Sequence, residues 1–225
     1  MSHPPAPDRP IVIFGVGSPL AIDLEESCAR LGIAVAAGVR NVPGPAYVSE
    51  RVAVIAAEAL DAALLAHPVA LPLFTPANRR AALADARSRG FREAATIVDP
   101  TAVVAGSTRI GTGGYVGMAC TIGGAGTFGD FVIVNRSASV GHHARIEDFA
   151  SIGPGAVLTG FVHLGQAAVV GAGAVILPRV AVGAHAVIGA GAVVTRPIPT
   201  RCLAVGNPAR IVKTGLPAFD LPVPA

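Results

Sequence analysis

Residues 133–158 read IVNRSASVGHHARIEDFASIGPGAVL, and an aliphatic residue stands at every sixth position of this stretch. The same period continues in both directions without an insertion. Its members are Val98, Val104, Ile110, Val116, Ile122, Phe128, Val134, Val140, Ile146, Ile152, Leu158, Leu164, Val170, Ile176, Val182, Ile188 and Val194. Two places before most of them stands a small residue, usually Ala. An α-helix has a period of about 3.6 residues and a flat strand a period of about 2, so neither explains the pattern.

A period of six residues is typical of a hexapeptide-repeat β-helix, in which each repeat supplies a short strand and a turn. Three repeats close one triangular coil, so residues 18 apart occupy equivalent places in adjacent coils. The aliphatic side chains then point into the prism and stack at a strand spacing of about 4.8 Å. The sequence therefore predicts an all-β parallel β-helix over residues 97–212. The apolar run 169–194 is part of its core and not a membrane span.

The residues before this region follow a different pattern, in which short apolar runs alternate with helical stretches. We expect strands at 11–14, 33–39, 52–55 and 69–74, and helices at about 20–31, 57–66 and 77–89. Strands that alternate with helices indicate a small parallel α/β domain, here residues 1–96. Residues 213–225 form a Pro-rich tail.

Ligands of parallel α/β sheets bind at the carboxyl ends of the strands. The candidate substrate-binding residues are therefore Gly15, Gly17 and Ser18 after the first strand, and Arg40 and Asn41 after the second. The turn has two glycines of a dinucleotide fingerprint but Leu20 in place of the third, which disfavours a nicotinamide site. A tight turn without a ligand is the alternative.

Composition and charge exclude several classes of protein and of partner. Apolar residues make up 52% of the 225 residues and charged residues 14%, which excludes a disordered chain. The net charge of +3 is small and scattered, so neither nucleic acid nor a membrane is expected as a partner. The opening MSHPPAPDRP lacks the basic start and apolar stretch of a secretory signal. Together with three widely spaced cysteines, this favours the cytoplasm.

A metal site is not expected. The cysteines Cys28, Cys120 and Cys202 lack metal-ligand spacing. The repeat region contains His142, His143, His163 and His185, and no two of them are 18 residues apart. They therefore do not stack into the three-histidine arrangement that a β-helix zinc site needs.

The turn at His142 and His143 is the candidate catalytic site. The equivalent turn positions one coil before and one coil after His142 are Gly124 and Gly160. Glycines there leave space for a substrate and expose backbone N–H groups. A base that titrates near neutral pH beside a bare N–H donor suits acyl transfer, since the base takes a proton and the donor stabilises the oxyanion. Two solvated surface histidines are the alternative.

A second turn carries small residues, Pro154, Ala172 and Ala190, along which an extended ligand could lie. A third turn stacks Asp130 on Asp148. We expect these two carboxylates to be solvated, or paired across a subunit interface.

An α/β domain followed by hexapeptide repeats that contain NRSASVGHHARIEDFASIGPGAVLTG (135–160) and end in AVGNPARIV (204–212) resembles the PglD/NeuD-type sugar acyltransferases. The resemblance implies a Rossmann-like N-terminal domain that holds a nucleotide-sugar and a left-handed parallel β-helix. It also implies acetyl-CoA as co-substrate, no metal, and a homotrimer with active sites between neighbouring β-helices.

The resemblance also implies roles for single residues. His142 matches the catalytic base, and Gly160 matches the residue whose N–H contacts the acetyl carbonyl. Ser151, Ala172 and Ala190 match positions that contact acetyl-CoA, the last two through backbone. Asn135 matches a position near the substrate amine. His143 stands where the family often has a Glu, and we include it with the catalytic residues.

The expected function is therefore N-acetylation of an amino sugar, with direct transfer from acetyl-CoA. The sequence leaves two alternatives, a sugar O-acetyltransferase of the sialic-acid type and a non-catalytic trimeric scaffold. The altered Gly15–Leu20 turn favours the scaffold, whereas the retained His142 and Gly160 favour the enzyme.

Overall fold

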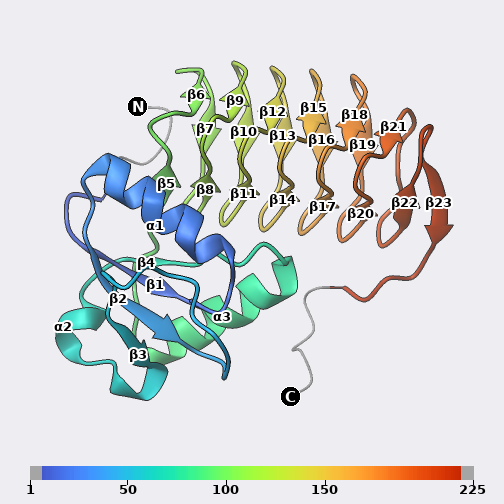
Figure 1. Ribbon diagram of the computed structural model, residues 1–225. Coiled ribbons are helices and arrows are strands. Elements are labelled where there is room, and N and C mark those ends of the chain that lie inside the picture. Colours follow the sequence, from blue (N-terminus) through green and yellow to red (C-terminus); the bar gives the residue numbers. More distant parts are fainter. Residues whose placement is uncertain (1–6, 219–225) are drawn as a thin grey trace.

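The computed structural model describes residues 7–218 (Figure 1). An α/β unit packs beneath the first coils of a long prism, and a β-hairpin follows the last coil before the chain runs on. Residues 1–6 of the predicted N-terminal domain and residues 219–225 of the predicted tail lie outside the described part.

The α/β unit has four parallel strands in the order β3-β2-β1-β4, with α1 on one face and α3 on the other (Figure 1). Its elements are β1 (Ile11–Phe14), α1 (Leu20–Leu31), β2 (Val35–Arg40), β3 (Val54–Ala56), a 3-10 turn (Ala57–Ala59), α2 (Ala62–Leu65), β4 (Val69–Ala70) and α3 (Pro76–Arg89). Gly32 and Gly90 end α1 and α3 in the left-handed conformation that glycine adopts at low cost.

Two predictions for this unit are wrong in detail. The helix expected at 57–66 is interrupted, because Leu60 is extended and Asp61 caps a new helix by accepting a hydrogen bond from the N–H of Leu64 at 2.9 Å. The strand expected at 69–74 ends at Ala70. Pro72 follows shortly after, and a proline lacks the N–H that would continue the ladder.

The repeat region forms a parallel β-helix, and its strands fall where the period of six predicts them. The short strands are β5 (Ile97–Val98), β6 (Val103–Val104), β7 (Arg109–Ile110), β8 (Tyr115–Val116), β9 (Thr121–Ile122), β10 (Thr127–Phe128), β11 (Ile133–Val134), β12 (Ser139–Val140), β13 (Arg145–Ile146), β14 (Ser151–Ile152), β15 (Val157–Leu158), β16 (His163–Leu164), β17 (Val169–Val170), β18 (Val175–Ile176), β19 (Ala181–Val182), β20 (Val187–Ile188) and β21 (Val193–Val194). A hairpin of β22 (Leu203–Val205) and β23 (Arg210–Lys213) closes the last coil.

The strands stack into three sheets, which we number as faces of the prism. Face 1 has the order β23-β22-β20-β17-β14-β11-β8-β5, face 2 the order β21-β18-β15-β12-β9-β6, and face 3 the order β19-β16-β13-β10-β7. Each residue pairs with the one 18 places along, as Val140 does with Leu158. From β7 to β21, the second strand residue and the small residue before each strand are buried inside, as at Val140 and Ala144, whereas Val98, Ala102 and Val104 of the first coil are partly buried. The predicted core is therefore confirmed.

The stacked aspartates have a structural role that the sequence reading missed. Asp148 accepts a hydrogen bond from the N–H of Asp130 at 2.9 Å, and Asp130 accepts one from the N–H of Thr112 at 2.8 Å. Each carboxylate thus reaches back one coil and pairs with a turn N–H. Both aspartates are also exposed, in line with the expectation of solvated carboxylates, and the added hydrogen bonds arise because equivalent residues in adjacent coils lie within reach.

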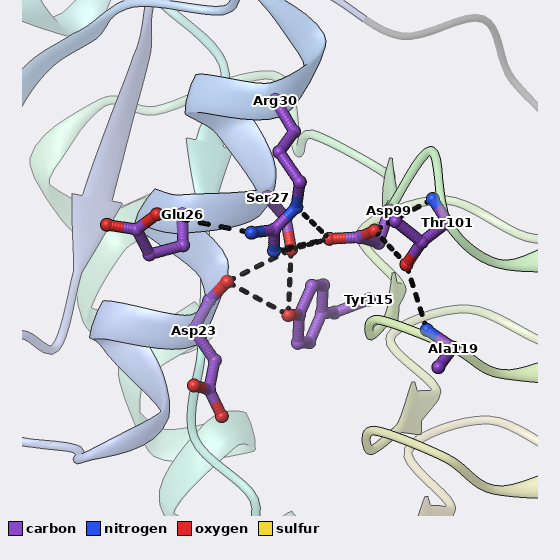
Figure 2. Close-up of polar contacts among 8 residues, drawn as sticks. All are labelled: Asp23, Glu26, Ser27, Arg30, Asp99, Thr101, Tyr115 and Ala119. Carbon is purple, nitrogen blue, oxygen red and sulfur yellow. Dashed lines mark hydrogen bonds and ion pairs between the residues drawn. The ribbon is translucent and has the colours of Figure 1, made fainter.

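Helix α1 contacts the first coils of face 1 through a buried polar cluster, which Figure 2 shows. Asp99 is fully buried and accepts hydrogen bonds from Arg30 Nε at 3.0 Å, from Ser27 Oγ at 2.6 Å and from Thr101 Oγ1 at 2.6 Å. Tyr115 OH lies 3.0 Å from Ser27 Oγ. Burial by itself would raise the pKa of Asp99, but these hydrogen bonds outweigh it and lower the pKa to about 2.

A second buried contact joins the unit to face 1 through Arg79 of α3. Its guanidinium donates to the carbonyl of Phe74 at 3.0 Å, to that of Ala150 at 3.3 Å and to Ser151 Oγ at 3.0 Å. It also bonds to the carbonyls of Leu73 and Phe149. Complete burial lowers the pKa of Arg79 to about 9. This side chain ties the loop after β4 to the β-helix.

Candidate active site

The two histidines predicted as catalytic lie together at the corner between faces 2 and 3, which we call the histidine corner (residues 142–143, 160–161 and 179). Both are exposed, as the repeat position predicts. His142 Nδ1 lies 3.0 Å from His143 Nδ1, within hydrogen-bond reach. His143 has a φ of 58°, like the fourth residue of most repeats, so the turn itself directs its ring outward. The corner therefore presents one paired and one free nitrogen of His142.

Gly160 lies directly beside His142, one coil further along. A Cβ at Gly160 would stand 2.8 Å from both Cε1 and Nε2 of His142, closer than carbon atoms tolerate. Only a glycine therefore lets the imidazole occupy this place. Among residues 7–218 nothing accepts a hydrogen bond from the N–H of Gly160. A base and an available N–H donor thus lie side by side.

Two further residues of the corner were missed by the sequence reading. Phe161 stacks on His143, with ring centroids 4.7 Å apart and an interplanar angle of 15°. The guanidinium of Arg179 lies over the other face of Phe161, with Cζ 4.4 Å from the ring centroid. His143, Phe161 and Arg179 follow one another at intervals of 18 residues, so the coil period applied to His143 would have found them.

The positions predicted to contact acetyl-CoA through backbone lie at the corner between faces 1 and 2. Ala172 and Ala190 are both exposed there, one coil apart. Neither N–H donates a hydrogen bond within the described part of the chain. The two alanines and the histidine corner flank face 2.

The other two predicted residues are buried rather than exposed. Ser151 is fully buried at the junction, where its hydroxyl donates to the carbonyl of Phe74 at 2.6 Å and accepts from Arg79. Its side chain is thus covered by the α/β unit, and a direct contact with acetyl-CoA does not fit this placement. Asn135 lies at the corner between faces 1 and 2. Its side-chain oxygen accepts a hydrogen bond from the N–H of Arg136 at 2.7 Å, and only 9% of the residue is exposed.

The predicted substrate-binding residues do come together. Strands β1 and β2 are neighbours with Phe14 opposite Val39, so Gly15 and Arg40 follow at the same edge of the sheet. Gly15 uses its N–H in the fold, since it donates to the carbonyl of Val39 at 3.0 Å. The remaining members, Gly17, Ser18 and Asn41, are all partly exposed at this edge.

The sheet edge and the histidine corner belong to different sides of one chain. The α/β unit packs on face 1, through Tyr115 and Ile133 against α1. His142 lies at the corner between the two other faces. A single chain therefore does not unite the predicted substrate and catalytic residues.

Face 3 carries a groove of about 500 Å³ lined by Thr127, Phe128, Gly129, Arg145, Ile146, Glu147, Asp148 and Gln166. Glu147 pairs with His163 at 2.9 Å and with Arg145 at 3.0 Å. Burial opposes ionisation of Glu147, but the hydrogen bonds from His163 and the Gln166 N–H outweigh it and lower its pKa. Among the described residues no group of three or more His, Cys, Asp or Glu side chains is arranged to hold a metal ion.

Comparison with known proteins agrees with this architecture. The family model described as bacterial transferase hexapeptide (six repeats) matches residues 161–196. No curated protein matches the chain significantly. Among solved structures, a single-residue variant of perosamine N-acetyltransferase from Caulobacter crescentus, in complex with CoA and GDP-perosamine, is 31% identical. The match covers 93% of this chain and 100% of that one, with a TM-score of 0.81.

The chain belongs to the PglD/NeuD-type sugar acyltransferases. A second member of this fold, the acetyltransferase domain of PglB from Neisseria gonorrhoeae in complex with acetyl coenzyme A, is 26% identical. The match covers 92% of this chain and 100% of that one, with a TM-score of 0.80. WeeI from Acinetobacter baumannii, 22% identical over 91% of this chain and 100% of that one with a TM-score of 0.73, shares the fold. The protein is thus an acyltransferase with a left-handed parallel β-helix.

None of the helices within residues 7–218 has both the length and the apolar composition needed to cross a membrane.

Proposed function

We propose that this protein is an N-acetyltransferase that moves the acetyl group of acetyl-CoA to the amine of a nucleotide-linked amino sugar. The observation that carries the proposal is the imidazole of His142 against Gly160, whose N–H is available. The 31% identity to an enzyme crystallised with CoA and GDP-perosamine supports the choice of co-substrate and of substrate class.

His142 acts as the general base in this proposal. Its Nδ1 is engaged by His143, which leaves Nε2 to take a proton from the amine as the amine nitrogen attacks the thioester carbon. The N–H of Gly160 donates to the oxygen that becomes negative in the tetrahedral intermediate. The carbon–sulfur bond then breaks, and the proton held by His142 passes to the departing CoA sulfur. No covalent acyl-enzyme is needed.

The co-substrate is proposed to lie along the corner between faces 1 and 2. The exposed alanines Ala172 and Ala190 have no side chain beyond Cβ, so an extended pantetheine arm can approach the backbone. Their available N–H groups suit its amide oxygens. Because these contacts are with the backbone, other small side chains should be tolerated at the two positions, whereas a large side chain should block the arm.

The acceptor is proposed to bind at the sheet edge formed by Gly15, Gly17, Ser18, Arg40 and Asn41. Since one chain holds this edge and His142 on different sides, we propose a homotrimer in which neighbouring chains complete each site. Asn135 is proposed to lie near the substrate amine across such an interface. Its partial burial limits it to a contact at the rim.

The test is acetyl transfer from acetyl-CoA to GDP-perosamine, followed by release of free CoA thiol and by mass spectrometry of the sugar nucleotide. Wild-type protein is expected to turn over, and His142→Ala is expected to lose about 100-fold or more in kcat. Binding of acetyl-CoA is measured in parallel by calorimetry. A folded protein that binds no acetyl-CoA at millimolar concentration would exclude the proposed co-substrate.

A further inference from the structure

The histidine corner contains a column of three planar groups. The His143 ring, the Phe161 ring and the Arg179 guanidinium stack in that order in successive coils. Phe161 has a φ of 61°, a conformation that bulky side chains adopt only at a cost, and 40% of it is exposed. Because the side chain of Phe161 is partly exposed, burial in the core does not explain why an aromatic residue stands in this strained turn. Its observed contacts are with the two histidines and with Arg179.

The column also fixes the plane of His142. The His142 ring meets the His143 ring at 89° and the Phe161 ring at 89°, with centroids 5.2 Å away in both cases. Gly160 supports the His142 ring from the side. Three neighbours therefore contact the imidazole, and within residues 7–218 none of them is a carboxylate.

The bond between the two Nδ1 atoms requires one donor and one acceptor. If His142 donates, its Nδ1 carries the proton and its Nε2 keeps a lone pair that can accept the proton of the amine. If His143 donates, His142 Nδ1 is the acceptor and the proton of a neutral His142 is on Nε2, where it blocks the base. Catalysis by His142 therefore depends on which ring holds the proton at Nδ1.

The proposed function requires the first arrangement, because the proton of the amine must pass to His142 Nε2. The groups that face His143 are His142 beside it and, beyond Phe161, the cation of Arg179. Among residues 7–218 neither imidazole bonds to a carboxylate. A neutral His143 that carries its proton at Nε2 can accept at Nδ1, and this is the tautomer that the first arrangement needs.

We propose that His143, Phe161 and Arg179 form a positioning column in which neutral His143 accepts the Nδ1 proton of His142 and thereby leaves His142 Nε2 unprotonated. This inference rests on the proposed function for the reaction that His142 serves. The column is the neutral counterpart of a carboxylate that orients a catalytic histidine. His143 is thus a positioning residue and does not touch the reacting atoms.

Nitrogen NMR of the apo protein tests the proton arrangement without any turnover. Protein labelled with nitrogen-15 in histidine, with His142→Gln and His143→Gln for assignment, reports the protonation of each ring nitrogen. At neutral pH we expect His142 to carry its proton at Nδ1 and His143 to carry its proton at Nε2. A proton at Nε2 of neutral His142 overturns the proposal, whether or not the protein acetylates the sugar tested.

Kinetics of three variants test the consequence. His143→Phe keeps a ring for the stack but removes the acceptor, and we expect kcat to fall by about 100-fold while the KM for acetyl-CoA stays unchanged within about twofold. His143→Glu restores an acceptor, so it should recover most of kcat and move the acid limb of kcat/KM to higher pH. Phe161→Leu removes the stack and should lower kcat by an intermediate factor.

Phe149→Leu is the matched control, because Phe149 stacks on Phe131 at another corner, with centroids 5.1 Å apart. It should leave kcat unchanged. If wild-type protein turns over and His143→Phe keeps the wild-type kcat, the column has no positioning role. If wild-type protein does not turn over, the proposed function fails and the NMR result alone decides the column.

Discussion

The junction between the α/β unit and face 1 differs from the histidine corner in almost every physical property. At the junction, Asp99 (Figure 2) and Arg79 are completely buried and bonded to partners far away in the sequence. At the corner, His142 and His143 are exposed, and within residues 7–218 their contacts are with residues of the same turn or of adjacent coils. Polar groups at the junction connect the two parts of the molecule, whereas those at the corner are open to solvent. Variants in the two regions should therefore affect different measurements.

The largest effect is expected at Arg79. Arg79→Met keeps much of the buried volume but removes every donor to the carbonyls around it, and each unpaired buried acceptor is costly. We expect the free energy of unfolding to fall by about 3 kcal/mol or more. Denaturant unfolding at a fixed protein concentration measures it. Arg87→Met, on the exposed side of the same helix, is the control, and an equal loss there would contradict the distinction.

The next largest effect is expected at Gly160, and it should appear in kcat rather than in the free energy of unfolding. Gly160→Ala places a Cβ 2.8 Å from the His142 ring, which must move away from its place. We expect kcat to fall by about 10- to 100-fold while the free energy of unfolding changes by less than about 0.5 kcal/mol. Gly106→Ala occupies the same corner three coils earlier, where a Cβ meets no atom within 4 Å. Full activity in Gly160→Ala would show that the ring position does not matter.

Asp99→Asn tests the charge at the junction through the pH dependence of the free energy of unfolding. Because the folded protein lowers the pKa of Asp99 to about 2, the ionised carboxylate stabilises the fold above the unfolded pKa, about 4. This contribution is about 2 kcal/mol at pH 7 and is lost as the pH falls from about 4 to about 2. Asp99→Asn should therefore be less stable than wild type at pH 7, with the difference shrinking below pH 4. A difference independent of pH would place the effect in packing rather than in charge.

The smallest effect is expected at the buried thiols. Burial raises the pKa of Cys28 to about 12 and that of Cys120 to about 11, so both should react slowly with thiol reagents at neutral pH. In Arg79→Met, we expect Cys28 of α1 to react faster than before while Cys120 in the β-helix changes less. Mass spectrometry of the labelled peptides distinguishes them. Equal acceleration would mean that the two parts unfold together.

Much of the fold was predictable because the repeat is local. A six-residue period places each strand and each core residue, and strands β5–β21 lie where it predicts them. The same period brings His142 beside Gly160. The α/β unit was predicted in class and in most elements, but Leu60 and Pro72 broke elements that composition alone would continue.

Ser151 and His143 mark where prediction from the sequence ended. Ser151 is the first residue of its short strand, as its equivalents in other coils are. The α/β unit nevertheless covers Ser151, and Arg79 donates a hydrogen bond to it. From the sequence, His143 is only a residue that replaces the family's Glu. The structure adds that its ring stacks on Phe161. Neither contact follows from residue type.

The sequence by itself determined the β-helix, its core and the corner on which the histidines lie, since these depend on spacing along one chain. The tertiary structure alone decided how the α/β unit docks, which side chains it buries and how His142 is oriented. Those outcomes depend on distances between residues far apart in the sequence, such as Asp99 and Arg30, and on ring planes in successive coils. A period specifies a position but does not specify a hydrogen-bond partner.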